Sequence, residues 1–182
     1  MIEDTVLNLS PAQQDTLDTA LQKTDAAMQR VLSMWPIEDI AGDTDAVLPE
    51  AAALAETRTP EQWQALHEQA LDALRHAQPE EALDVFVQLV EHRPLDAPYL
   101  FGFALCFQQL GQLQEATGYF SLAHALEPSD GACAFRLGEC LLALGHVAEA
   151  QDALRAAIEL DAVAGADPVV REMAQQLLDQ IL

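Results

Sequence analysis

The residues that could carry out covalent or metal chemistry are few in this sequence and lie far apart. Cys106, Cys133 and Cys140 form no Cys-x-x-Cys pair, so neither a redox motif nor a zinc site is indicated. No His-Glu-x-x-His motif brings two histidines to one helix face. The five histidines are scattered: His67, His76, His92, His124 and His146. We therefore expect reduced, buried cysteines that act as small hydrophobic side chains, and we predict no metal site.

Motifs for nucleotide or acyl chemistry are also missing from the sequence. It contains no Walker loop, no glycine-rich dinucleotide fingerprint and no Gly-x-Ser-x-Gly. His67 and Glu68 are adjacent and could suggest a general base, but an ordinary pair on a helix surface is the simpler interpretation. We predict a binding protein that is not an enzyme and uses no cofactor.

The composition narrows the classes of partner. Thirty acidic residues against eight Lys and Arg give a formal net charge of −22. Such a surface repels phosphate backbones and anionic lipids, so we expect no direct contact with nucleic acid and none with a membrane. The charge is suited to neutral or basic partners, although solubility alone would explain it equally well. Neither a long apolar run nor a secretory leader is recognisable, so we expect a cytoplasmic protein.

The elements that would position a binding site are revealed by an internal repeat. Gly111 and Gly145 lie 34 residues apart, and small and large residues behind each glycine match at the same interval. These pairs are Ala116 and Ala150, Phe120 and Leu154, and Ala123 and Ala157. In the most degenerate repeat Ala77 replaces the glycine, and we expect Pro79 to interrupt the helix there. A 34-residue period with Gly, Ala, aromatic and Pro at set places is the tetratricopeptide pattern.

The pattern predicts an all-α fold, a superhelix of three helix pairs whose stacked units enclose a concave inner face. The predicted repeats span residues 63–96, 97–130 and 131–164, within a repeat region of 60–164 that opens with a capping box at Thr59. We expect an amphipathic helix in residues 1–34 with a possible role in dimerisation, an acidic loop or short helix in 35–59, and a capping helix in 165–182.

The first helix of each tetratricopeptide pair lines the concave face. Counted from the start of each repeat, the second, fifth, ninth and twelfth residues point inward. Most of these positions are apolar here, which favours an extended apolar peptide as ligand. Leu, Phe and Glu139 replace the Lys, Arg and Asn of a carboxylate clamp, so we disfavour a clamp for chaperone tails. The candidate peptide-binding residues are Leu71, Leu74, Phe101, Leu105, Phe135 and Leu142. The alternative is that Phe101 and Phe135 pack between neighbouring helices.

From Trp63 to Leu160 the chain resembles the class II type III secretion chaperones of the SycD/LcrH kind, which guard translocator proteins. Two segments carry the resemblance: EEALDVFVQLVEHRPLDAPYLFGFALCFQQLGQLQEA from Glu80, and RLGECLLALGHVAEAQDAL from Arg136. That family has three tetratricopeptide repeats, an N-terminal helix and a C-terminal capping helix.

The resemblance implies a protein of the bacterial cytoplasm that binds hydrophobic translocator proteins before their secretion. Such chaperones hold a short extended client segment, often of the Pro-x-Leu-x-x-Pro type, in the concave groove without ATP, which prevents aggregation and premature association. Several form homodimers through the N-terminal helix. Two alternatives remain open: a generic tetratricopeptide scaffold or adaptor, and a co-activator that acts through a transcription factor.

Overall fold

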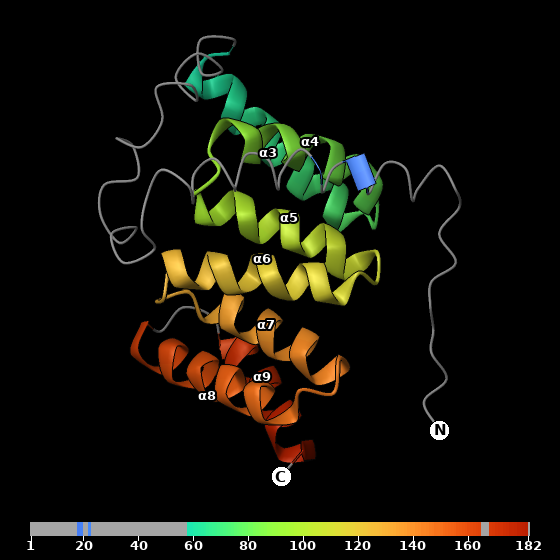
Figure 1. Ribbon diagram of the computed structural model, residues 1–182. Coiled ribbons are helices and arrows are strands. Elements are labelled where there is room, and N and C mark those ends of the chain that lie inside the picture. Colours follow the sequence, from blue (N-terminus) through green and yellow to red (C-terminus); the bar gives the residue numbers. More distant parts are fainter. Residues whose placement is uncertain (1–17, 20–21, 23–57, 165–167, 182) are drawn as a thin grey trace, which may run out of the picture.

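The computed structural model describes residues 18–19, 22, 58–164 and 168–181, and the helices of its main part form a single stack (Figure 1). The regular elements of these residues are helical and include no strand, which confirms the predicted all-α class. The labelled helices are α3 (Pro60–Arg75), α4 (Pro79–His92), α5 (Ala97–Gln109), α6 (Leu113–Leu126), α7 (Gly131–Ala143), α8 (Val147–Ala164) and α9 (Pro168–Ile181).

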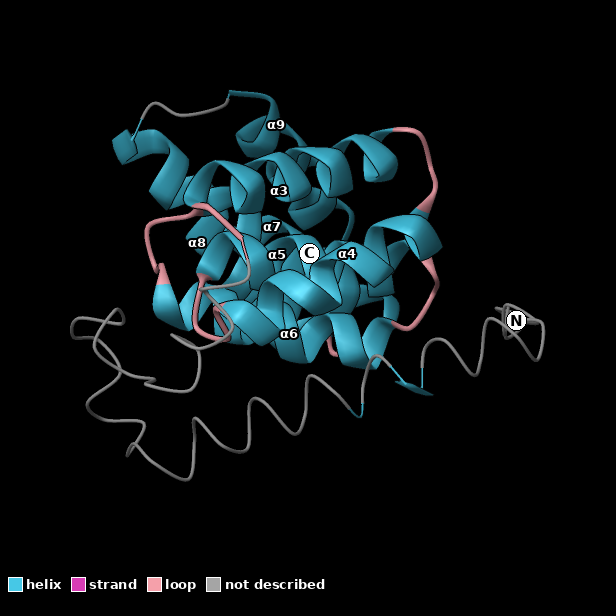
Figure 2. Cartoon of the chain, turned by 90° about the horizontal axis from the view of Figure 1, so that it is seen from above, coloured by secondary structure: helices cyan, strands magenta, loops and turns pink. Residues whose placement is uncertain are grey.

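Each helix packs on the next one along the chain, and short loops join α3 to α8 (Figure 2). Helix α3 also contacts α5, and α7 also contacts α9. Residues 18, 19 and 22 are helical, but most of the predicted helix in 1–34 and most of the predicted loop in 35–59 lie outside the described residues. The pairs α3–α4, α5–α6 and α7–α8 therefore form the body of the molecule, and α9 packs on its C-terminal end.

Side-chain caps begin the first helix of each pair. Thr59 and Gln62 form the predicted capping box of α3, in which the Thr59 amide donates to Gln62 Oε1 at 2.8 Å. Asp96 Oδ1 accepts from the Tyr99 amide at 3.3 Å at the start of α5. Asp130 Oδ1 accepts from the amides of Ala132 and Cys133 at 2.9 and 3.1 Å at the start of α7. Each cap stabilises its helix by about 1 kcal/mol.

The turns inside the three helix pairs share one backbone geometry. Gly111 and Gly145 have φ of 75° and 82°, and Ala77 has φ of 55° at the equivalent position. The amide that follows each of these residues donates to the carbonyl five residues earlier at 2.9 Å, as Gln78 does to Ala73. The helix end is therefore kept without glycine in the first pair, although left-handed backbone costs Ala about 1 kcal/mol more than it costs Gly.

The core consists of two clusters of buried side chains. The larger joins α3 to α7 and includes Phe86, Phe103, Phe107 and Phe120, and the smaller joins α7, α8 and α9. Gly102 lets α5 approach α4 closely, because a Cβ there would overlap the Phe86 ring. Helix packing thus depends on this glycine as a small neighbour of a large ring.

The three cysteines are free and buried in the core. Burial is the main cause of their raised pKa values, which reach about 12 for Cys133 and about 11 for Cys140. Burial raises the pKa of the Cys106 thiol further still, and its Sγ donates to the Gly102 carbonyl at 3.3 Å. Protonated thiols in apolar surroundings are poor nucleophiles and ligands, so these side chains act in packing.

Candidate functional site

The candidate site is built on α3, α5 and α7, the first helices of the three pairs. Counted within each repeat, their fifth, ninth and twelfth residues include seven that are partly exposed. We call these seven the first-helix face: His67, Leu71, Phe101, Leu105, Gln108, Glu139 and Leu142. Direct packing of α3 on α5, and a hydrogen bond from Gln108 Nε2 to Glu139 Oε2 of 3.4 Å between α5 and α7, hold the three helices side by side.

Four of the six predicted peptide-binding residues keep part of their side chains accessible. Leu71, Phe101 and Leu105 are half-buried and pack against the larger core cluster. Leu142 is half-buried near the end of α7. The apolar part of the first-helix face is therefore centred on α3 and α5.

The other two predicted residues, Leu74 and Phe135, are buried, with exposed fractions of 7% and 2%. Phe135 packs in the smaller cluster with Leu154 of α8 and with Ala174 and Leu178 of α9. Helix α9 contacts α7 and contributes to this cluster, so Phe135 packs among neighbouring helices. A contact between either side chain and a ligand stays a prediction that would require the chain to rearrange.

Phe101 both packs between helices and keeps a surface that a ligand could contact. Its ring lies 5.5 Å from that of Phe120 in α6, centroid to centroid, so one side supports the core. The remainder of the side chain is accessible. An aromatic ring anchored in this way is a pre-organised contact surface, because little rotamer freedom is left to lose on binding.

His67 stands in the first repeat at the position of Phe101 and Phe135. Its ring makes edge contacts with Tyr99 at 5.1 Å and Phe86 at 5.9 Å between centroids. Burial lowers the pKa of this imidazole, an effect partly opposed by Asp96 and Glu68. The neutral ring therefore extends the apolar surface, which differs from the surface pair with Glu68 expected from sequence.

Glu139 introduces a charge at the α7 end of the first-helix face. Its Oε2 accepts from Arg136 Nη1 at 2.8 Å as well as from Gln108. The Arg136 guanidinium also lies 5.6 Å from the centre of the Phe135 ring. The sequence placed Glu139 on this face, but only the structure shows the partners that position its carboxylate.

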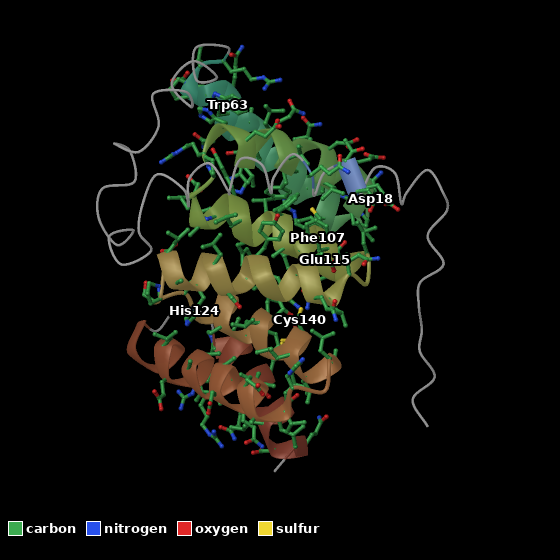
Figure 3. All side chains as sticks on the ribbon, in the orientation of Figure 1. Asp18, Trp63, Phe107, Glu115, His124 and Cys140 are labelled. Carbon is green, nitrogen blue, oxygen red and sulfur yellow. The ribbon has the colours of Figure 1, made fainter. Side chains whose placement is uncertain are left out.

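The sequence did not predict an aromatic stack that involves Trp63. Trp63 stacks on His92 with centroids 4.0 Å apart, and the Arg58 guanidinium lies 4.8 Å from the Trp63 ring centre. Figure 3 places Trp63 at the α3 end of the stack, far from Cys140 in α7. Arg58 and Trp63 are near in sequence but His92 is not, so no local pattern could have signalled the stack. We interpret it as the packing that secures α3 on α4.

The described ranges 58–164 and 168–181 offer no support for a metal centre or for a membrane span. Within them, no three His, Cys, Asp or Glu side chains gather in a way that could hold a metal ion. Helices α3 to α9 likewise include none that is long and apolar enough to cross a bilayer.

Comparisons with known proteins agree with this geometry. The family model described as tetratricopeptide repeat matches residues 107–177. No curated protein matches the sequence significantly. The type III secretion translocator chaperone SycD of Yersinia enterocolitica has 25% identity and a TM-score of 0.65, over 71% of this chain and 90% of that chain.

Two solved complexes are also similar. SycD with a peptide of the translocator YopD has 26% identity and a TM-score of 0.61, over 68% of this chain and 94% of that chain. PcrH, a protein of Pseudomonas aeruginosa, with the chaperone binding region of PopD has 22% identity and a TM-score of 0.65, over 68% and 93%. The resemblance predicted from the sequence is confirmed in the fold: this chain has a tetratricopeptide superhelix like that of the type III secretion translocator chaperone SycD.

Proposed function

We propose that this chain is a secretion chaperone that binds an extended apolar segment of a type III translocator protein on its first-helix face. The observation that carries the proposal is a group of three half-buried apolar side chains, Leu71, Phe101 and Leu105. Leu71 and Leu105 are the ninth residues of successive repeats, and Phe101 is the fifth residue of the second repeat. The complex of SycD with a YopD peptide supports it, since SycD has the same fold.

The physical basis is the burial of apolar surface that the client would otherwise expose. A translocator segment able to enter membranes would aggregate or insert prematurely if it were left in water. Half-buried Leu and Phe side chains can cover such a segment, while the net charge of −22 keeps the complex soluble. Release requires moderate affinity, and no cofactor or catalytic group takes part. We accordingly propose a bacterial cytoplasmic location and no enzymatic activity.

Co-expression and pull-down with the translocator proteins of the same genome tests this function. Phe101→Ala with Leu105→Ala should retain helical circular dichroism but weaken client binding by about 2 kcal/mol or more, the scale of an interface hot spot. Leu126→Ala is the matched control, because Leu126 is also a half-buried hydrophobic residue of the larger cluster but lies on α6. Capture of no translocator by a folded protein would contradict the proposal and favour a scaffold.

We further propose a role for each segment of the chain. Repeats 63–96, 97–130 and 131–164 would bind the client, residues 165–182 would cap the third repeat, and residues 1–34 would form a homodimer. SycD has been crystallised as an alternative dimer, which supports self-association in a protein of this fold. Deletion of residues 1–34 should give a monomer by light scattering, and an unchanged dimer mass would rule out that role.

A further inference from the structure

The first-helix face changes from apolar to charged between its second and third repeats. The ninth residue of each repeat is Leu71, Leu105 and Glu139 in turn. All three are half-buried, so the change places a carboxylate in the environment that leucine occupies twice before it. A half-buried charge needs polar partners, because its removal from water is unfavourable.

The carboxylate of Glu139 is held in place from two helices. Arg136 on α7 and Gln108 on α5 both donate to Oε2, at 2.8 and 3.4 Å. The side chains of Arg136 and Glu139 are 39% and 25% exposed, so the pair remains accessible from outside. Since both of these bonds reach Oε2, the geometry leaves Oε1 able to accept a further hydrogen bond.

We propose that Glu139 selects client segments that carry a lysine or arginine next to their apolar anchors. The inference rests on the proposed chaperone function and names the polar end of the same site. A client ammonium or guanidinium would donate to Oε1 in a charge-assisted hydrogen bond, which is stronger than a neutral one. The net charge of −22 adds a favourable long-range field for such a partner.

The repeat spacing gives the register of the client pattern. Packed helices lie roughly 8–10 Å apart, and an extended chain advances about 3.3 Å per residue. One repeat therefore corresponds to about three client residues. Two apolar side chains three residues apart would meet Leu71 and Leu105, and the basic side chain would follow after three more residues to reach Glu139.

Synthetic fluorescent peptides with the full chain test this inference. One peptide carries Leu at its third and sixth residues and Lys at its ninth, and a second has Gln in place of Lys. Each is also made in reverse order, because the direction of the client is not assumed. For wild-type protein we expect the correctly placed Lys, in one of the two directions, to tighten binding about tenfold over Gln, which corresponds to about 1.4 kcal/mol.

Two protein variants localise the effect. Glu139→Gln removes the charge but keeps an oxygen that can accept from Gln108 and Arg136, so the fold should persist and the preference for Lys should vanish. Asp152→Asn is the matched control, because Asp152 forms the same kind of pair with Arg155, at 3.2 Å, on α8. It changes net charge equally and should retain the preference.

The outcomes separate this inference from the function on which it rests. Equal binding of the Lys and Gln peptides, or a preference that survives Glu139→Gln, would overturn the role of Glu139 while leaving apolar client binding intact. Loss of peptide binding in Phe101→Ala with Leu105→Ala would support that apolar binding independently. If none of the peptides binds wild-type protein, the proposed site and the inference both fail.

Discussion

The second and third repeats differ in the exposure of the side chain at their fifth position. Phe101 is half-buried and accessible at the fifth position of the second repeat, whereas Phe135 is 2% exposed at that position of the third. Phe135 belongs to the cluster that joins α7, α8 and α9, together with Leu154, Ala174 and Leu178, whereas Phe101 lies at the edge of the larger cluster. Repeat position sets where a side chain lies, but the helices packed around it determine whether a partner can reach it.

The consequence for function is an uneven binding surface. Apolar side chains are accessible over α3 and α5, and the α7 end offers the charged network of Glu139, Arg136 and Gln108. An apolar segment is therefore expected to lie mainly over the first two repeats. Variants of equivalent residues in different repeats test this difference.

The largest effect is expected for Phe135→Ala. Loss of a fully packed ring from the smaller cluster should reduce the free energy of unfolding by about 3 kcal/mol. Phe101→Ala removes a half-exposed ring, and we expect a loss of about 1 kcal/mol. Urea denaturation followed by circular dichroism measures both. Equal losses would show that the two phenylalanines share one environment and would break the comparison.

Gly102 and Gly138 compare two helix contacts, that of α5 with α4 and that of α7 with α8. Gly102→Ala should destabilise the protein by about 2 kcal/mol, because the new Cβ overlaps the Phe86 ring. Gly138→Ala places its Cβ 2.9 Å from both Cδ2 and Cγ of Leu154, a less severe overlap than the one between Gly102 and Phe86. We expect a smaller loss there, about 1 kcal/mol or less, since Ala also favours the helix. Thermal unfolding of the two variants ranks them, and the reverse order would refute this explanation.

Two substitutions in the turns should change the stability by smaller amounts and in opposite directions. Ala77→Gly should stabilise the protein by up to about 1 kcal/mol, because glycine adopts the left-handed backbone of this turn without a steric penalty. Gly145→Ala should lose about the same amount at the equivalent turn of the third repeat. Denaturation midpoints test both, and no gain from Ala77→Gly would mean that the first turn relaxes at little cost.

The smallest effect is a shallow pH dependence. Burial lowers the pKa of both His67 and His92, so the unfolded chain takes up these protons more readily than the folded chain does. Stability should therefore be full above about pH 6.5, the usual histidine value, and should fall as the pH drops through it toward the folded pKa values. Thermal unfolding between neutral and mildly acidic pH measures this slope.

Matched variants assign the slope to particular histidines. His67→Gln and His92→Gln should each flatten it, because burial lowers the pKa of both imidazoles. A slope that survives these two substitutions would have another origin.

Much of the fold could be predicted because its signals are local. The capping box at Thr59 and the glycines at 111 and 145 act on neighbouring backbone and mark where helices begin and end. The interval between repeats shows that the same helix pair recurs. Four residues of the candidate site, Leu71, Phe101, Leu105 and Leu142, are accessible where repeat position indicated; their contact with a client is still a prediction.

The remainder depended on contacts between residues far apart in the chain. The helix pairs, their order and the positions that could line a binding face could be predicted from the sequence alone, since caps, turns and periodicity are encoded within a few residues. Contacts between helices account for the burial of Phe135 in the cluster of α7, α8 and α9, for the stacking of Trp63 on His92, and for the position of Glu139 between Gln108 and Arg136. Exposure and hydrogen bonding are set by whichever helix packs alongside, and no local pattern records that neighbour.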